Sequence, residues 1–330
     1  MTATTTDRKM DKLIHLMVKN AMVVVPGPKI AAEIGVSRST VWQYIEKLRA
    51  LGVEIKGHPS SGYQLQKLPD ILAPSLIKPE LDDIQIGRRI LHYFKTDSTN
   101  SVAMALAARG EEHGTVVVAE EQTAGRGRFG RVWYSEKSSG IYVSVILRPA
   151  LAPSAAPVLT LMAGLAVHRA IETSTGLAAD IRWPNDVLVS GRKVCGILTE
   201  MSAELDRLHA VVLGIGINVN HREIPDELKP IATSLRIETG KTVSRVQVLV
   251  ALLKEIQEHY DLLLHAGGAT IIERWSAAST FAEGKPIRVL TNSGEYRAVT
   301  AGLDPSGALR VRRSDGREET LVAGEIIEVK

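Results

Sequence analysis

The sequence Gly125-Arg-Gly-Arg-Phe-Gly-Arg-Val-Trp133 (GRGRFGRVW) interleaves three glycines with three arginines. Gly125, Gly127 and Gly130 match the spacing GxGxxG that marks dinucleotide-binding folds. That fingerprint needs a helix directly after the glycines and an acidic residue about 20 positions further on. Here the next apolar stretch is Ile141–Leu147, which predicts a strand, so we reject the dinucleotide interpretation. Arginines alternating with glycines favour an anion that backbone N–H groups and guanidinium groups approach together.

Around this stretch, helical and strand patterns alternate over residues 81–278. The predicted helices cover Asn100–Arg109, Leu159–Thr173 and Val246–Leu264, and the predicted strands cover Val116–Ala119, Ile141–Leu147, Ile181–Val189 and Lys193–Met201. Ser190 and Gly191 lie between the last two strands and are typical of a tight hairpin turn. We therefore expect an α+β domain.

The length and composition of the chain limit its class. A chain of 330 residues is too long for one ordinary core and predicts two or three domains. Apolar residues make up 45% and charged residues 23%, as in a globular protein. The N-terminus lacks the apolar core of a signal peptide. No apolar run approaches the roughly 20 residues of a membrane helix, so we expect a cytoplasmic protein without a membrane partner.

Cysteine and histidine give no sign of a structural metal. Cys195 is the only cysteine and alternates within an apolar strand, so we expect it to pack in the core. The nine histidines are scattered without the paired spacing of a zinc site. We therefore predict no resident metal ion.

Residues 1–66 form the most basic part of the chain. They carry nine Lys/Arg and five Asp/Glu, which leaves the rest of the chain with a net charge of −1. Helical spacing of Leu13, Leu16 and Met17 predicts a first helix, and a short second helix would begin near Pro28 without a Ser, Thr or Asp cap. A basic unit on a near-neutral body is where a polyanion would dock.

A third helix is predicted after Ser37, which is a good N-cap, and Gly52 would end it as the C′ residue. Its N-terminal end would meet base edges, as in helix-turn-helix proteins. The DNA-binding candidates are Ser37, Arg38, Ser39, Thr40, Trp42, Gln43 and Lys47. Residues 53–65 predict a hairpin with a glycine-rich turn, the wing. A small helical domain that binds protein is the alternative.

Two further units complete the chain. Three prolines, Pro69, Pro74 and Pro79, punctuate residues 67–80, which we interpret as a linker. Residues 279–330 predict five short strands with Gly and Asp turns, as in a small β-barrel. The predicted domains are therefore 1–66, 81–278 and 279–330, with the linker at 67–80.

Five separated motifs resemble those of the biotin protein ligase family and occur in the same order. They are Asp97-Ser-Thr-Asn100, Glu121-Gln-Thr-Ala-Gly-Arg-Gly-Arg128 continuing to Trp133, Arg182-Trp-Pro-Asn-Asp186, Lys193-Val-Cys-Gly-Ile-Leu198 and Gly214-Ile-Gly-Ile-Asn218. The second and third are highly specific, and the other three would be weak alone. With the repressor-like head and the C-terminal unit, the resemblance covers nearly the whole chain. It implies a multidomain α+β protein with a winged helix-turn-helix, an α/β catalytic domain built on a class II synthetase-like mixed sheet, and an SH3-like β-barrel.

The resemblance also implies the chemistry. The family joins biotin to ATP, releases pyrophosphate and passes biotin from biotinyl-adenylate to a lysine of a carboxylase carrier domain. The reacting carboxylate and phosphate repel each other, so fixed cations must offset that repulsion. The catalytic candidates are Lys193, Arg126 and Arg128. Mg²⁺ would arrive with ATP and keep its waters, because it needs only one or two carboxylates besides phosphate.

The remaining site residues are carried over from the family's motifs. The biotin-binding candidates are Ser98, Thr99, Asn100, Gln122, Gly125, Arg126, Gly127, Arg128, Trp133, Lys193, Gly196, Leu198 and Gly214, and the ATP-binding candidates are Arg131, Asn185, Asp186 and Asn218. Phe129 departs from the family, in which relatives can have arginine, and the loop loses a charge there.

The partners implied are a biotin carboxyl carrier domain, operator DNA and a second copy of the chain, in a homodimer that biotinyl-adenylate favours. Two alternatives compete with this interpretation. A lipoate- or octanoate-activating enzyme of the same fold is disfavoured by the glycine–arginine stretch. A ligand-sensing transcription factor without catalysis is disfavoured by the presence of Arg126, Arg128 and Lys193.

Overall fold

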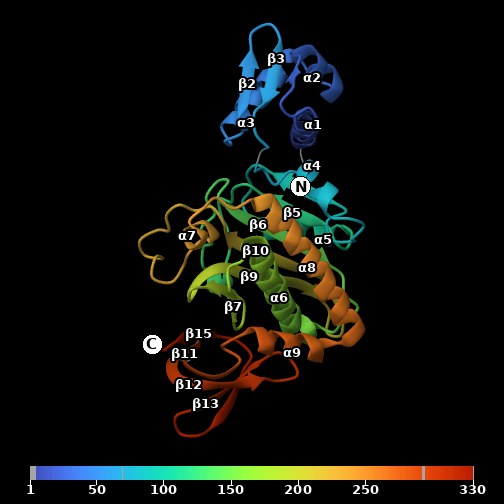
Figure 1. The fold of residues 1–330 in the computed structure, drawn as a ribbon. Coiled ribbons are helices and arrows are strands. Elements are labelled where there is room, and N and C mark those ends of the chain that lie inside the picture. Colours follow the sequence, from blue (N-terminus) through green and yellow to red (C-terminus); the bar gives the residue numbers. More distant parts are fainter. Residues whose placement is uncertain (1–4, 69, 292–293, 330) are drawn as a thin grey trace.

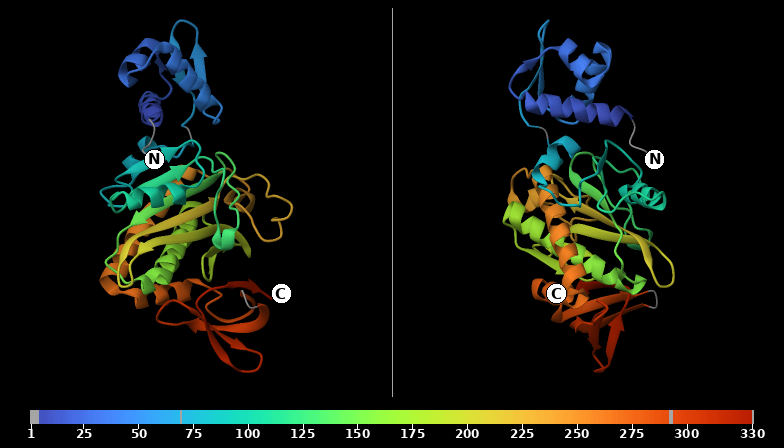
Figure 2. Two further views of the ribbon diagram at one scale, coloured as in Figure 1. Left: turned by 180° about the vertical axis from the view of Figure 1, so that it is seen from behind. Right: turned by 90° about the vertical axis from the view of Figure 1, so that its right-hand side faces the viewer.

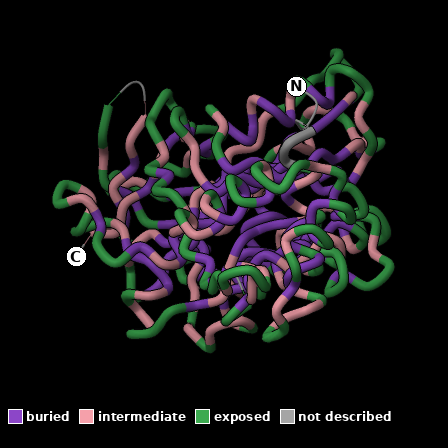
Figure 3. The backbone as a smooth tube through the Cα atoms, turned by 90° about the horizontal axis from the view of Figure 1, so that it is seen from above, coloured by how far each residue is buried: buried purple, intermediate pink, exposed green. Residues whose placement is uncertain are grey.

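The computed structural model describes residues 5–68, 70–291 and 294–329. Three units follow one another along the molecule (Figures 1 and 2). The N-terminal head lies at one end, a seven-stranded sheet with its helices forms the middle, and a small sheet lies at the opposite end. Buried residues gather along the inner segments, and exposed residues form the outer turns (Figure 3).

The head has the predicted winged helix-turn-helix arrangement. It comprises α1 (Thr5–Lys19), β1 (Val24–Val25), α2 (Gly27–Ile34), α3 (Arg38–Arg49), β2 (Ile55–His58) and β3 (Gly62–Leu65). Ser37 caps α3 by accepting from the Thr40 N–H at 3.1 Å, as predicted, and α2 begins without a side-chain cap. The helix α3 ends at Arg49 with Ala50 as C-cap, so Leu51 is the C′ residue and Gly52, predicted to be C′, lies one position further on, with φ +87°.

The segment predicted as a linker is packed against both the head and the body. It contains α4 (Pro74–Ile77) and the 3₁₀ turn η1 (Lys78–Glu80). Ile71, Leu72 and Ile77 are at most 1% exposed. The prolines fit here because proline is tolerated in the first turn of a helix, where no N–H is needed. Pro69 lies outside the described residues.

The central sheet has the strand order β4-β5-β6-β10-β9-β8-β7. The strands are β4 (Ile90–Tyr93), β5 (Val116–Ala119), β6 (Gly140–Leu147), β7 (Ala179–Arg182), β8 (Asp186–Val189), β9 (Arg192–Ala203) and β10 (Leu208–Asn218). Strands β4 and β5 pair in parallel and the other neighbours are antiparallel, so the sheet is mixed as predicted. The stretch 181–189 is two strands, not one, because Pro184 cannot donate to a ladder and the chain turns there.

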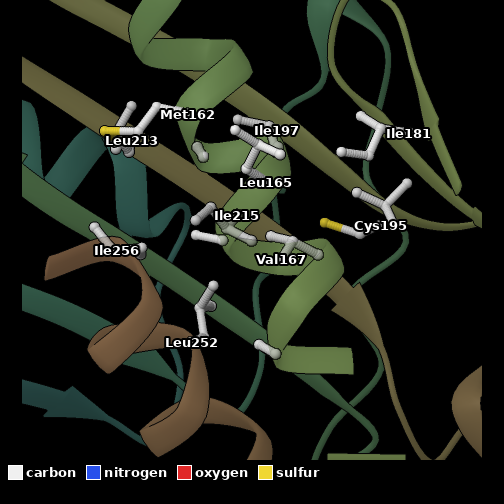
Figure 4. Packing of buried hydrophobic residues seen from close by; sticks show 14 of the residues in the cluster. Met162, Leu165, Val167, Ile181, Cys195, Ile197, Leu213, Ile215, Leu252 and Ile256 are labelled. Carbon is white, nitrogen blue, oxygen red and sulfur yellow. The ribbon is translucent and has the colours of Figure 1, made fainter. Parts of the chain in front are cut away.

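Helices cover the two faces of this sheet unequally. One face packs on α6 (Ala156–Thr175) and α8 (Arg245–Ala266), with α9 (Gly268–Ala278) beside them. Figure 4 shows Met162 and Leu165 of α6 beside Leu213 and Ile197, while Leu252 of α8 lies near Ile215. The other face carries α5 (Thr99–Ala108) over only part of its area. The uncovered part of this second face becomes the floor of a pocket.

The helix α6 corrects one expectation. The stretch Pro153–Thr175 is long and apolar enough to cross a membrane, with a mean hydropathy of 1.3. Two-thirds of the most apolar part of this stretch is buried inside the protein. Its apolar character is therefore explained by its place in the core.

The C-terminal unit is an antiparallel sheet with the order β14-β13-β12-β11-β15. Its strands are β11 (Glu283–Thr291), β12 (Gly294–Leu303), β13 (Leu309–Arg313), β14 (Glu318–Leu321) and β15 (Glu325–Glu328). All five predicted strands are present. In residues 294–329 no pairing joins β14 to β15, so closure into a barrel stays a prediction.

Candidate active site

A pocket lies on the uncovered part of the α5 face. Ala210 and Val212 of β10 pack under α5, and the same face of β10 continues as Gly214 and Gly216 in the pocket floor. Period-2 alternation keeps these positions on one side of the strand. Walls come from the start of α5, the loop between β5 and β6, the loop after β10, and Glu325 of the C-terminal sheet.

The pocket gathers nearly all of the predicted small-molecule residues. Those that line it are Ser98, Thr99, Asn100, Gln122, Arg126, Gly127, Arg128, Arg131, Trp133, Asn185, Lys193, Gly196, Leu198, Gly214 and Asn218. They come from five motifs spread over 121 sequence positions, so their convergence is a property of the fold. Gly125 and Asp186 are the two candidates that do not line it.

One end of the pocket is a network of amide and hydroxyl groups, in which the Glu200 carboxylate also accepts from Asn100 Nδ2 at 2.8 Å. The Gln122 carboxamide oxygen accepts from the Thr99 N–H at 2.8 Å, and its Nε2 donates to Ser135 Oγ at 2.9 Å. Asn100 Nδ2 donates to the Leu198 carbonyl at 3.1 Å, and Ser144 Oγ lies 2.6 Å from Asn100 Oδ1. A network fixed in this way holds amides and hydroxyls ready for a neutral polar ligand.

Glycines on two strands make room for large side chains. A Cβ at Gly216 would lie 2.5 Å from the indole nitrogen of Trp133, and one at Gly196 would lie 2.8 Å from the same ring. Trp133 Nε1 is buried without a hydrogen-bond partner among the described residues. The indole therefore forms an apolar wall above a glycine floor.

Two glycines have a different role from the predicted one. A Cβ at Gly214 would lie 2.0 Å from Asn100 Oδ1, so this glycine makes space for Asn100 as well as for a ligand. A Cβ at Gly125 would lie 2.6 Å from Ser135 Oγ and 2.6 Å from the Trp133 carbonyl oxygen. Gly125 thus packs the base of the loop and does not face the pocket.

The glycine–arginine stretch folds as a tight hairpin, without the following helix of a dinucleotide site. Trp133 N–H donates to the Gly125 carbonyl at 2.9 Å, and Gly127 N–H donates to the Arg131 carbonyl at 2.7 Å. The turn at its tip, η2 (Arg128–Gly130), holds Phe129 at φ +56° and Gly130 at φ +72°. The Phe129 ring is exposed and lies 4.8 Å from the Arg128 guanidinium.

Each loop arginine contacts a protein acceptor. Arg126 Nη2 lies 2.7 Å from Glu200 Oε2. Arg131 binds Glu325 through two hydrogen bonds of 2.5 and 2.8 Å. Arg128 donates from Nη1 to the Gly324 carbonyl at 3.1 Å. Burial lowers the pKa of the Arg128 guanidinium, against the opposing effect of Glu325 and Asp186.

Lys193 is held on both sides. Its N–H donates to the Ile231 carbonyl at 2.8 Å, which ties it to the loop after β10. Its Nζ lies 2.5 Å from Asp186 Oδ1 and 5.4 Å from the centre of the Trp133 ring. An ammonium at this position faces the pocket beside the apolar wall.

Asp186 acts as a counterion. Burial opposes its ionisation, but Lys193 and Arg182 hold the pKa of the Asp186 carboxyl below its usual value. Arg182 Nη2 lies 2.7 Å from Asp186 Oδ2. Lys193 and Arg182 thus pair with this carboxylate in the structure, and its place on the ATP side stays a prediction. Asn185 donates to the Ile197 carbonyl at 2.7 Å and leaves its oxygen near Arg128.

Several contributors were missed from the sequence. Glu200 follows Leu198 by two positions on β9, so strand alternation places both on the pocket face. Ser144 pairs with Gly214 across β6 and β10, a register that the sequence alone does not fix. The apolar loop residues Ile224, Pro225 and Leu228 also line the pocket and carry no chemical signature.

The head presents a second, separate candidate surface. Arg38, Ser39 and Gln43 are exposed along the outer side of α3, and Trp42 is 55% exposed. Thr40 is partly buried and bonds to the Ser37 cap, and Lys47 lies 4.4 Å from the centre of the Phe94 ring. Lys47 is exposed and also contacts Phe94 of the body, and its place in the DNA-facing set stays a prediction.

Profiles of known families match all three units. Residues 93–218 match the biotin/lipoate A/B protein ligase family, residues 11–64 match a helix-turn-helix domain, and residues 284–327 match the biotin protein ligase C-terminal domain.

Characterised relatives extend over nearly the whole chain. The bifunctional ligase/repressor BirA of Bacillus subtilis (strain 168) is 39% identical over 307 residues, which cover 92% of this chain and 94% of that protein. The bifunctional ligase/repressor BirA of Escherichia coli (strain K12) is 29% identical over 301 residues, which cover 91% of each.

A solved structure agrees with the fold of the body. The biotin protein ligase from Aquifex aeolicus in complex with biotin and ATP superposes with a TM-score of 0.63 at 31% identity. It covers 74% of this chain and 99% of its own. Family profiles, a long relative and a solved structure thus agree with one another, and the chain belongs to the biotin protein ligase family, as a member with a helix-turn-helix domain.

Proposed function

We propose that this protein joins biotin to ATP and transfers the biotinyl group to a lysine of a biotin carboxyl carrier domain. The observation that carries the proposal is one pocket with three chemical zones. A neutral polar network at Thr99 and Gln122 suits the ureido ring, the wall at Trp133 suits the aliphatic tail, and Lys193 with the loop arginines suits the reacting anions.

The first step would be the transfer of the adenylyl group of ATP to the biotin carboxylate. A biotin carboxylate oxygen attacks the α-phosphorus of ATP, the bond from that phosphorus to the bridging oxygen breaks, and pyrophosphate leaves. Lys193 and Arg128 would offset the charge that gathers on the α-phosphate. Both have protein partners at present, so substrate phosphate would exchange with Asp186 and with the Gly324 carbonyl.

The second step would release AMP. The neutral amine of the carrier lysine attacks the biotinyl carbonyl, an amide forms, and the bond to the AMP phosphate oxygen breaks. Ser98, which lines the pocket and is 3% exposed, would stay on the biotin ring throughout.

Mg²⁺ would enter with ATP and reduce the charge of the triphosphate. Asn185 and Asn218 offer only amide groups at the pocket, and the Asp186 carboxylate is paired with Arg182 and Lys193 before substrate binds. The residues described here contain no group of three metal-ligating side chains. We therefore expect phosphate oxygens and water to supply most of the Mg²⁺ ligands.

The test compares carboxylic acids. Purified protein is given ATP, Mg²⁺ and either biotin, lipoate or octanoate, and pyrophosphate release is measured. Biotin should be the preferred substrate by orders of magnitude. Preference for lipoate or octanoate would support the alternative enzyme of the same fold, and no release with any acid would support a sensor without catalysis.

We further propose that the head binds operator DNA and that the chain represses transcription. The exposed set on α3 and the basic charge of residues 1–66 support this. Deletion of residues 1–66 should abolish DNA binding and leave some biotin transfer. Full-length protein without salt-dependent DNA affinity would instead favour a protein-binding head.

We also propose a homodimer that biotinyl-adenylate strengthens. The glycine–arginine hairpin would close on the adenylate, at a backbone cost of roughly 1–2 kcal/mol per ordered residue that ligand contacts must offset. Tighter DNA binding would follow by linkage. Sedimentation equilibrium with and without biotin and ATP tests this, and an unchanged association constant would refute the dimer switch alone.

A further inference from the structure

A buried ion cluster lies where the head joins the body. Arg245, the first residue of α8, is 1% exposed at its side chain, and Glu120, directly after β5, is fully buried. The distance from Arg245 Nη1 to Glu120 Oε2 is 2.8 Å. Burial opposes ionisation of Glu120, but Arg245 and His92 outweigh it and hold its pKa at about 2. Both groups are therefore charged inside the protein.

The same cluster forms hydrogen bonds with the segment that connects the head to the body. Asp70 Oδ1 accepts from the Arg245 N–H at 2.8 Å, and its Oδ2 lies 3.1 Å from Arg245 Nε. The Leu72 N–H donates to Glu120 Oε1 at 2.7 Å. Two of the first residues after the wing are thus bonded to charged groups of the body.

The cluster also touches both ends of the loop over the pocket. Glu120 is the residue before that loop, and its carbonyl accepts from the Ser138 N–H at 2.9 Å. Gly140, at the far end of the loop, accepts from Arg245 Nη1 at 3.2 Å. In the same region, Lys137 of the loop donates to the Ala50 carbonyl of the head at 3.2 Å.

The second pocket loop begins at the cluster as well. Asn220 follows β10, and its N–H donates to the Ser139 carbonyl. Its Nδ2 lies 3.5 Å from Asp70 Oδ2 and donates to the Val243 carbonyl at 2.8 Å. Asp70 is therefore linked to the base of the second loop through Asn220 and to the end of the first loop through Arg245.

We propose that Arg245 is a positioning residue that couples the segment carrying the head to both pocket loops, through its contact with the partly exposed Asp70 and its buried pair with Glu120. The inference rests on the proposed function only for the choice of ligands. A guanidinium suits this position because it can reach several acceptors in fixed directions, which an ammonium cannot.

The first test is hydrogen exchange on the full chain with and without biotin, ATP and Mg²⁺. In wild-type protein, ligand should slow amide exchange in residues 121–139 and also in residues 70–77. Asp70→Asn should keep the response of residues 121–139 and lose that of residues 70–77. The matched control is Asp82→Asn, which removes the exposed 2.7 Å pair with Lys254 on the same helix and should behave like wild type.

Three outcomes decide the matter. A ligand response at residues 70–77 that survives Asp70→Asn would overturn the proposal, as would a wild-type response confined to residues 121–139. No response anywhere in wild-type protein would refute the proposed ligands, and the coupling argued from them would fall with it.

The second test uses Arg245→Lys, which keeps the buried positive charge but replaces the planar guanidinium with an ammonium group. Looser pocket loops should raise the KM for biotin and ATP about tenfold, the size expected for one lost charge-assisted contact, with kcat within about twofold. A purely structural role would lower the active fraction, which reduces kcat and leaves KM unchanged.

Discussion

Two sets of arginine–carboxylate pairs differ in burial and, with it, in what they can do. At the pocket mouth, Arg131 is 62% exposed and binds Glu325, and Arg126 is 43% exposed and binds Glu200. At the junction, Arg245 binds Glu120 with both side chains at most 1% exposed. The distances are similar, between 2.5 and 2.8 Å, so geometry alone does not separate the two sets.

The two sets differ in how far solvent reaches them, and therefore in the free energy that is lost when a pair is broken. An exposed pair is worth about 0–1 kcal/mol because water replaces either partner at little cost. Breaking a buried pair leaves an uncompensated charge and costs about 3–5 kcal/mol. The mouth pairs can therefore give way to substrate phosphate, whereas the junction must hold its geometry for the loops to stay in place.

The largest expected effect breaks the junction. Arg245→Met should lower the free energy of unfolding by about 3–5 kcal/mol, because Glu120 stays buried without its cation. The matched variant Arg131→Met, at the mouth, should cost less than about 1 kcal/mol. Urea unfolding of both variants measures the difference, and equal losses would contradict the contrast between the two sets.

His221, a histidine near Arg245, is expected to make the stability of this region depend on pH. His221 is fully buried, and burial lowers its pKa to about 4, with Glu136 opposing and Arg245 adding to the shift. The folded protein therefore keeps His221 neutral. Protonation of His221 does not lower the free energy of unfolding above about pH 6.5. As the pH falls from 6.5 toward 4, the free energy of unfolding decreases, because the unfolded chain binds the proton more strongly than the folded protein.

The expected loss between pH 7 and pH 4.5 is about 2–3 kcal/mol from this group. His221→Gln should reduce the pH dependence of unfolding by that amount. The control is His265→Gln, at the exposed end of α8. A slope that His221→Gln leaves unchanged would mean that other groups account for the acid sensitivity.

The sequence predicted the helices and strands better than the contacts between the units. Alternation and helical spacing located most strands and helices to within a few residues, because local patterns report which face is buried. Residues 67–80, predicted as a linker, connect the head to the body and are packed against both. Their prolines suggested an open connection, but Leu72 and Asp70 are fixed by Glu120 and Arg245, which lie 48 and 175 positions away.

The site shows the same limit. Motif residues such as Lys193 could be carried over one by one, and the pocket brings them together. The partners that hold them could not be predicted, because Asp186 and Glu200 reach them only across the strand pairing of the sheet. Strand register and loop packing are set by the whole core rather than by neighbouring residues.

A third prediction concerns Lys193, which lies in the pocket wall. Lys193→Ala should slow adenylate formation by some 30–150-fold, which corresponds to about 2–3 kcal/mol for a lost charge-assisted contact. Pyrophosphate exchange measures it. The control is Lys229→Ala, an exposed lysine of the loop after β10 that pairs with Asp226. Exchange at the wild-type rate would remove Lys193 from the catalytic set.

The smallest expected effect tests whether a mouth pair is exchangeable. Glu325→Gln removes the carboxylate that holds Arg131 through two hydrogen bonds and leaves the arginine free for nucleotide phosphate. The KM for ATP should fall about two- to fivefold, in line with the 0–1 kcal/mol of an exposed pair. Glu328→Gln is the matched control, since Glu328 lies on the same strand and pairs with Lys285 at 2.7 Å, outside the pocket lining. A higher KM in Glu325→Gln alone would show that this pair holds the loop in its productive position. The Arg131–Glu325 pair would then have a positioning role like that of the Arg245–Glu120 pair.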